Sequence, residues 1–157
     1  MRVTAVVPTY NEAENLPSLI AALMALPLEL SVLVVDDDSP DGTGAIADGL
    51  ASTNPGRVAV LHRKGRRGLR SAYIEGFRAA LGNGAEGVIQ MDADFSHDPA
   101  RLPDMVAALE SADVVLGSRY VPGGSVDHRW PIWRKGLSAW ASTSSPARSA
   151  MPWRRRA

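Results

Sequence analysis

Two aspartates, Asp92 and Asp94, follow the apolar segment 87–91, which is typical of a buried strand. Paired carboxylates at a strand end offer the hard oxygen ligands that Mg²⁺ or Mn²⁺ prefers, and such ions complete their coordination with water and substrate phosphates. The chemistry indicated is metal-assisted binding of a diphosphate. The triplet alone is more typical of a solvated turn, because aspartates are common at strand ends and helix caps.

The segments that must position these carboxylates alternate between strand and helix. Short apolar runs predict strands, and apolar residues at helical spacing predict helices between them. The predicted strands are 3–7, 31–35, 58–61, 87–91 and 114–116, and the predicted helices carry the apolar residues of 16–24, 46–50, 72–81 and 102–109. This order predicts an α/β fold in which a mostly parallel sheet is flanked by helices on both faces.

Three local signals set the expected boundaries of these elements. Pro8 is expected to end the first strand, and Asn15 to cap a helix that contains Pro17 in its first turn. Asp98 and Pro99 are expected to cap and begin the helix that follows the paired aspartates.

Polar loops follow four of the predicted strands. They are 8–12, 36–43, 92–97 and 117–120. Ligands of parallel sheets bind outside the carboxyl ends of the strands, so we expect these loops to converge on one site. No Gly-X-Gly-X-X-Gly or Walker sequence follows the first strand, which disfavours dinucleotide and P-loop chemistry.

Composition limits the classes of function. The chain has 157 residues, of which 45% are hydrophobic, which suits one globular domain. Its formal net charge is zero, so it lacks the bulk charge of a nucleic-acid binder. Cysteine is absent, which excludes disulfides and thiolate metal sites. No apolar run is long enough for a signal peptide or a membrane span, so we expect a cytoplasmic protein that is soluble or peripheral on a membrane.

Several longer motifs occur along the chain. They are Val7-Pro8-Thr9-Tyr10-Asn11-Glu12, Val35-Asp36-Asp37, Gly68-Leu69 with Ala72-Tyr73, Met91-Asp92-Ala93-Asp94-Phe95-Ser96-His97, Gly117-Ser118-Arg119-Tyr120 and Trp130-Pro131 with Arg134. With these motifs in this order, the chain resembles family 2 glycosyltransferases, in particular polyprenol-phosphate (dolichol-phosphate) mannosyltransferases. The resemblance extends from the N-terminus to about residue 138.

The resemblance implies a GT-A-like (Rossmann-like) domain that transfers mannose from GDP-mannose to a polyprenyl phosphate, with inversion and with Mg²⁺ or Mn²⁺. It implies a nucleotide-sugar site made of Pro8, Tyr10, Glu12, Val35, Asp37, Asp92, Ala93, Asp94 and Arg119. It implies metal ligation by Asp92, Asp94 and Ser96, and catalytic roles for Asp94 and Arg119. Two alternatives stay open: a family 2 transferase that uses UDP-glucose or a related donor, and a catalytically silent nucleotide-binding remnant.

Several segments allow two interpretations. The basic loop 63–70 is either a lid over the phosphates or a solvated charge run, and His97 either supports the metal site or decorates a turn. The Trp- and Arg-containing segment 129–140 either contacts a membrane surface near the lipid acceptor or covers the core.

The chain departs from the family pattern in three places. Asp38 and Arg70 stand where the family commonly has glycine, so we expect a glycine-like backbone torsion at Asp38 and added bulk at Arg70. The catalytic domain is expected to cover 1–138, and 139–157 to be a non-homologous, disordered basic tail. The family pattern continues further, so we expect a truncated chain.

Overall fold

The computed structural model of the protein describes residues 1–65, 68–118 and 150–152. It divides into two compact units, Met1–Pro99 and Ala100–Ala157. The first unit contains β1 (Val3–Thr9), α1 (Leu16–Met24), β2 (Leu30–Asp36), α2 (Thr43–Thr53), β3 (Val58–His62), α3 (Leu69–Gly82) and β4 (Gly87–Gln90). The predicted alternation of strands and helices is therefore confirmed for this unit.

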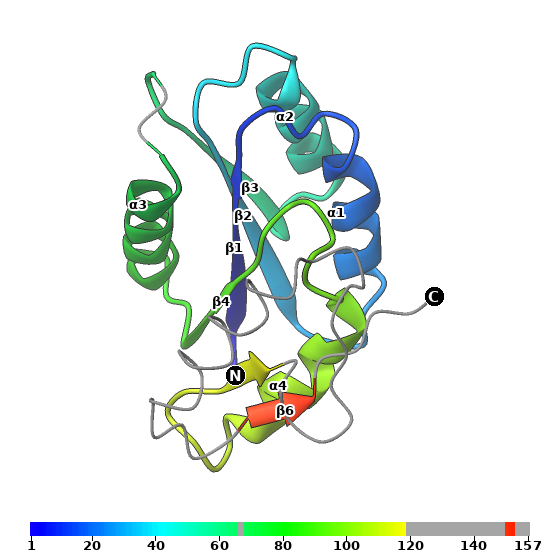
Figure 1. Cartoon of the computed structure of the whole chain (residues 1–157), viewed down its shortest axis with the longest axis vertical. Coiled ribbons are helices and arrows are strands. Elements are labelled where there is room, and N and C mark those ends of the chain that lie inside the picture. Colours follow the sequence, from blue (N-terminus) through cyan, green and yellow to red (C-terminus); the bar gives the residue numbers. More distant parts are fainter. Residues whose placement is uncertain (66–67, 119–149, 153–157) are drawn as a thin grey trace, which may run out of the picture. The chain divides into compact units, whose positions relative to one another are not determined.

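The four strands of the first unit form one parallel sheet in the order β3-β2-β1-β4. β1 and β2 are buried along almost their whole length, which explains why both read as continuous apolar runs. Helix α3 covers one face of the sheet, and α1 and α2 cover the other (Figure 1). The prediction of a parallel sheet with helices on both faces is thus confirmed.

A compact apolar cluster holds α3 on the sheet. It contains Val6, Leu33, Val35, Ala72, Tyr73 and Ala80, and partly buried Phe77 packs against it. Of the apolar residues that predict α3, Ala72 is buried, whereas Ile74 and Leu81 are exposed to solvent. The spacing predicts the helix correctly, but it places two residues in the core that the structure leaves outside.

The first strand is longer than predicted. β1 continues through Pro8 to Thr9, and Pro8 lies in register with Val35 of β2. Proline removes one N–H donor and leaves the carbonyl acceptors of a parallel ladder intact, so the carbonyl of Thr9 still accepts a hydrogen bond from the N–H of Asp37 at 3.0 Å. This extension carries β1 to the edge of the sheet where the polar loops lie.

The second unit contains α4 (Leu102–Ala108), β5 (Leu116–Ser118) and β6 (Ala150–Pro152), and a short 3₁₀ turn (Pro99–Arg101) precedes α4. The predicted helix start at Pro99 is therefore a 3₁₀ turn, and the α-helix begins three residues later. None of the described helices is both long enough and apolar enough to cross a membrane.

The prediction of a strand at 114–116 in the main sheet is wrong. The strand lies at Leu116–Ser118 and pairs in parallel with β6, whereas Val114 is exposed. A short apolar run indicates a strand but carries no information about which strand it pairs with. β6 lies within 139–157; the rest of that range is outside the described residues, so the disordered tail stays a prediction.

Candidate functional site

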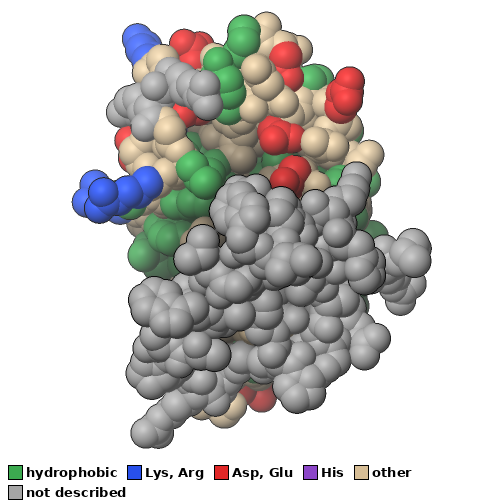
Figure 2. Space-filling model, in the orientation of Figure 1, with side chains coloured by type: hydrophobic (Ala, Val, Ile, Leu, Met, Phe, Trp, Pro, Cys, Tyr) green, Lys and Arg blue, Asp and Glu red, His purple; other side chains and the backbone are tan. Residues whose placement is uncertain are grey.

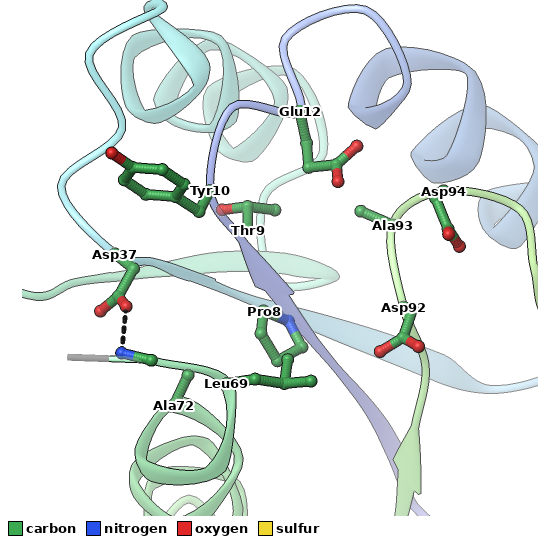
Figure 3. A pocket seen from close by; sticks show the side chains of 11 residues that line it. Pro8, Thr9, Tyr10, Glu12, Asp37, Leu69, Ala72, Asp92, Ala93 and Asp94 are labelled. Carbon is green, nitrogen blue, oxygen red and sulfur yellow. Dashed lines mark hydrogen bonds between the residues drawn. The ribbon is translucent and has the colours of Figure 1, made fainter. Parts of the chain in front are cut away.

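A pocket of about 250 Å³ opens at the carboxyl edge of the four-stranded sheet. Its lining comes from the ends of β1 and β2, the loop after β4 and the first turn of α3 (Figure 3). The residues that line it are Pro8, Thr9, Tyr10, Glu12, Asp37, Gly68, Leu69, Ala72, Asp92, Ala93 and Asp94. Segments far apart in the sequence thus meet at one site, as the parallel topology predicts.

Most residues predicted for the nucleotide-sugar site line this pocket. They are Pro8, Tyr10, Glu12, Asp37, Asp92, Ala93 and Asp94. Val35 does not line it, because its side chain is fully buried in the core beneath α3. Arg119 lies outside the described residues, so its role in the site stays a prediction.

The structure adds four residues to the lining that the sequence did not assign: Thr9, Gly68, Leu69 and Ala72. The last three belong to the Gly68-Leu69 and Ala72-Tyr73 motifs, so a signal for them was present in the sequence. Of the expected fourth loop, 117–120, Gly117 and Ser118 lie in β5, which is not a strand of this sheet, and 119–120 are outside the described residues. The segment between β3 and α3 contributes Gly68 to the lining.

The loop after β4 presents Asp92 through two hydrogen bonds. The hydroxyl of Tyr73 donates to Oδ1 of Asp92 at 2.7 Å, and the backbone N–H of Asp92 donates to Nδ1 of His97 at 3.2 Å. Burial and the bond to Asp92 raise the pKa of Tyr73 above its ordinary value of 10.0, so Tyr73 stays a donor through the physiological range. His97 thereby fixes the turn that carries both aspartates.

Asp94 is more exposed than Asp92 and is held by Ser96. The N–H of Ser96 donates to Oδ1 of Asp94 at 2.8 Å. Partial burial raises the pKa of Asp94, but the hydrogen bonds from Ser96 outweigh it, and the net effect is a pKa below the ordinary 3.8. Asp94 is therefore ionised at neutral pH and available as an oxygen ligand.

On the opposite side of the pocket, Asp37 is buried and firmly held. Its Oδ1 lies 2.7 Å from Nη1 of Arg63, and its Oδ2 accepts a hydrogen bond from the N–H of Gly68 at 2.7 Å (Figure 3). Arg63 is itself buried, so for this member of loop 63–70 both the lid and the solvated-run interpretations are wrong. Lys64 and Arg70 are exposed, and Arg66 and Arg67 lie outside the described residues.

The loops that carry Tyr10, Glu12 and Asp37 are tied to each other. The Thr43 hydroxyl accepts a hydrogen bond from the N–H of Glu12 at 2.9 Å, and the buried Asp36 carboxylate accepts one from the Thr9 hydroxyl at 3.0 Å. Asn15 is the N-cap residue of α1 and Pro17 lies in the first turn, as predicted, but the Asn15 side-chain amide donates to Glu12 at 2.8 Å and makes no capping bond to the helix. These bonds hold the β1–α1 and β2–α2 loops at the rim of the pocket.

Asp38, next to Asp37, adopts the glycine-like backbone torsion expected from the sequence. Its φ is +60°, in the left-handed region. Its side chain accepts a hydrogen bond from the N–H of Gly65 at 3.1 Å, which links the loop after β2 to the loop after β3.

The pocket is rich in carboxylates: Glu12, Asp37, Asp92 and Asp94 line it, and Arg63 pairs with Asp37. Figure 2 shows acidic side chains at several separate places on the described part of one face. Within the described residues, no three acidic or histidine side chains are close enough to hold a metal by themselves. The aspartates fit a hard divalent cation whose remaining positions are filled by water and by the phosphates of a ligand.

Residues 4–155 match the family described as "Glycosyl transferase family 2". The chain is 49% identical to the undecaprenyl-phosphate mannosyltransferase of Micrococcus luteus, over 93% of this chain and 59% of that protein. It is 47% identical to the polyprenol monophosphomannose synthase of Mycolicibacterium smegmatis, over 92% of this chain and 54% of that protein. The chain thus spans about half the length of the curated relatives it matches.

Two solved structures have a fold similar to that of this chain. The mannosyltransferase PcManGT of Pyrobaculum calidifontis, solved with GDP-Man and Mn²⁺, superposes with a TM-score of 0.66 at 30% identity, over 75% of this chain and 35% of that one. TarS of S. aureus (residues 1–349) superposes with a TM-score of 0.58 at 28% identity, over 82% of this chain and 39% of that one.

Proposed function

The chain belongs to glycosyl transferase family 2 and has a GT-A-like fold, and from this premise we propose that it carries the donor site of a polyprenyl-phosphate mannosyltransferase. The activity proposed is transfer of mannose from GDP-mannose to a polyprenyl phosphate. The observation that carries the proposal is the 47–49% identity to two polyprenyl-phosphate mannosyltransferases over nine-tenths of the chain.

We assign two groups of lining residues to different parts of the donor. Pro8, Tyr10, Glu12 and Asp37 lie together at the ends of β1 and β2, and we assign them to the guanine and ribose. Carboxylates and amide groups there would accept and donate the hydrogen bonds that distinguish one nucleoside from another. The loop after β4 would then face the diphosphate and the sugar.

Asp94, with Asp92 beside it, is proposed to hold Mg²⁺ or Mn²⁺ against the diphosphate. When bound, the ion would supply Lewis-acid stabilisation of the charge that develops on the leaving nucleoside diphosphate. Ser96 contributes by holding the Asp94 carboxylate in place and keeping its pKa low. Tyr73 orients the Asp92 carboxylate from beneath.

Arg119 is proposed to contact the donor phosphates or the acceptor phosphate, since a guanidinium binds phosphate with two parallel hydrogen bonds. A phosphate acceptor is already an oxyanion near neutral pH, so a dedicated general base is less necessary than for a hydroxyl acceptor. In-line attack would invert the anomeric centre and give a β-linked lipid phosphate sugar. A polyprenyl acceptor resides in a membrane, so we further propose peripheral contact with the cytoplasmic face through segment 129–140, which lies outside the described residues.

Calorimetric titration of GDP-mannose tests the donor and the metal together. The titration is run with Mn²⁺, with EDTA, and with Asp94→Ala, and UDP-glucose serves as the competing donor. Asp104→Ala is the matched control, because Asp104 is an exposed carboxylate on α4 that does not line the pocket. The proposal expects Mn²⁺-dependent binding that is selective for GDP-mannose, lost in Asp94→Ala and retained in Asp104→Ala.

Two results would contradict the proposal. Tighter binding of UDP-glucose than of GDP-mannose would assign the pocket to another donor of the same family. Absence of binding by either sugar nucleotide would identify the chain as a remnant with the family's sequence and without its donor site. If GDP-mannose binds, incubation with a short polyprenyl phosphate and labelled GDP-mannose measures transfer directly.

A further inference from the structure

Arg63 is a buried cation at the edge of the pocket. It follows β3 directly, and only 3% of its surface is exposed. Arginine is almost never buried without partners, because removing its charge from water is costly. The partners of Arg63 therefore indicate what its burial accomplishes.

The guanidinium joins the end of β2 to the first turns of α3. Nη1 lies 2.7 Å from Oδ1 of Asp37 and donates to the carbonyl of Gly68 at 3.3 Å. Nη2 donates to the hydroxyl of Ser71, and Nε lies 3.3 Å from Oε2 of Glu75. One side chain thus contacts four residues on two separate elements.

Gly68 closes this arrangement into a ring. Its carbonyl accepts from Arg63, and its N–H donates to Oδ2 of Asp37 at 2.7 Å. Gly68 has φ +88° and ψ 161°, a conformation that side-chain-bearing residues rarely adopt. This backbone torsion lets both polar groups of Gly68 face the Asp37–Arg63 pair.

Asp37 and Gly68 both line the pocket, together with Leu69 and Ala72 of the same helix start, whereas Arg63 does not. We propose that Arg63 is a positioning residue for the nucleoside: it fixes the Asp37 carboxylate and the first turn of α3 as one rigid wall. We call Arg63, Asp37, Gly68, Ser71 and Glu75 the arginine clamp. The inference rests on the proposed function, since it assigns this wall to the nucleoside of the donor.

The clamp explains why arginine serves here better than lysine. The planar guanidinium presents five N–H donors in a fixed fork, which can reach a carboxylate, a carbonyl and a hydroxyl at once. A lysine ammonium retains the charge opposite Asp37 but cannot hold the same directions. The clamp therefore predicts a graded loss of nucleotide affinity from arginine to lysine to an uncharged side chain.

The test measures GDP binding in the presence of Mn²⁺ by calorimetry for Arg63→Met, Arg63→Lys and Ser71→Ala. Lys64→Met is the matched control, because Lys64 is the exposed neighbour in the same basic loop. Leu23→Ala is the stability control, because Leu23 is fully buried on α1 and does not line the pocket. All variants are compared at a temperature at which thermal unfolding shows each of them folded.

We expect Arg63→Met to weaken GDP binding by about tenfold or more, as for loss of a charge-assisted hydrogen bond, with Arg63→Lys intermediate. Ser71→Ala removes one branch of the clamp at small cost to folding, and we expect a loss of about two- to fivefold. Lys64→Met and Leu23→Ala should bind as the wild type does. The inference would be overturned if the Arg63→Met and Ser71→Ala proteins are folded and bind GDP with wild-type affinity. If Arg63→Met does not fold, the GDP affinities of Ser71→Ala and Arg63→Lys test the inference in its place.

Hydrogen exchange of the nucleotide-free protein separates this inference from the proposed function. The clamp predicts faster exchange at the Gly68 amide in Arg63→Lys and Ser71→Ala than in the wild type, with no change in Lys64→Met. If the wild type binds no nucleotide, the proposed function fails with the nucleoside assignment, while the exchange rates still decide whether Arg63 fixes this wall. Unchanged exchange at Gly68 in both clamp variants would overturn the inference whatever the protein binds.

Discussion

The carboxylate of Asp92 accepts a hydrogen bond from the Tyr73 hydroxyl, which rises from α3 beneath the pocket. Tyr73 is buried, and its ring packs against Phe77 with a centroid separation of 5.7 Å. The aromatic body therefore belongs to the core, while the hydroxyl belongs to the site. This side chain connects the packing of α3 to the orientation of a proposed metal ligand.

We predict that Tyr73→Phe lowers the free energy of unfolding by about 1–2 kcal/mol, because it removes one hydrogen bond to a carboxylate and keeps the ring. The folded pKa of Tyr73 is raised above the ordinary 10.0, so its contribution is complete below pH 10 and is lost as the pH rises further, where only the unfolded tyrosine ionises. Urea unfolding of the wild type and of Tyr73→Phe between pH 7 and pH 11 measures the difference in the free energy of unfolding and shows whether it falls as the pH rises.

The control for this prediction is a double-mutant cycle with Asp92→Ala, which removes the acceptor, read by unfolding and by Mn²⁺-dependent GDP binding. Coupling between the two positions is expected, since each side chain is the other's partner. Additive effects of the two substitutions, or a stability difference that persists unchanged to pH 11, would contradict the role given to the hydroxyl.

At the scale of elements, α3 approaches the sheet so closely that one of its positions requires glycine. A Cβ added at Gly76 would meet Cγ1 of Val6 and would lie 3.0 Å from Cγ2 of Val35. Both valines belong to the central strands β1 and β2 and are fully buried. The same helix start forms one wall of the pocket, so the seating of α3 sets the position of Leu69 and Ala72.

We predict that Gly76→Ala destabilises the protein by about 1–3 kcal/mol, because overpacking outweighs the better helix propensity of alanine. Gly82→Ala is the control, since a Cβ at this position of the same helix meets nothing within 4 Å. Denaturant unfolding of the two variants is the measurement. Equal stabilities for them would show that α3 can shift away from the sheet without cost.

At the scale of the whole molecule, net charge and exposed apolar side chains both influence self-association. The chain has zero formal net charge and a sequence pI of about 6.8. Ile74 and Leu81 lie seven residues apart on one face of α3, and both are exposed. Little electrostatic repulsion near neutral pH opposes association through this apolar strip.

We predict that the protein self-associates most strongly near pH 6.8 and that Ile74→Glu with Leu81→Glu reduces the association. Light scattering at equal concentration from pH 5.5 to pH 8.5 gives the measurement, and Ala45→Glu with Ser52→Glu, at two exposed positions on α2, controls for the two added charges alone. A monodisperse monomer at pH 6.8, or equal suppression by the α2 variant, would count against association through α3.

The sequence by itself determined the strands and helices of the first unit, their parallel arrangement and most of the pocket lining. It does so because hydrophobic periodicity is local, and because parallel topology sends every strand's carboxyl end to one edge. The sequence alone therefore predicts that the loops carrying Tyr10, Asp37 and Asp92 meet, as they do at the pocket.

Only the tertiary structure decided which side chains and strands contact each other over long distances in the sequence. Four features depend on which face a residue turns to and on which distant segment lies opposite it. They are the burial of Arg63 against Asp37, the hydrogen bond from Tyr73 to Asp92, the core position of Val35 and the pairing of β5 with β6. A basic residue in a basic loop reads as solvated until a buried carboxylate is found beside it. Long-range packing supplies that information, and no local pattern contains it.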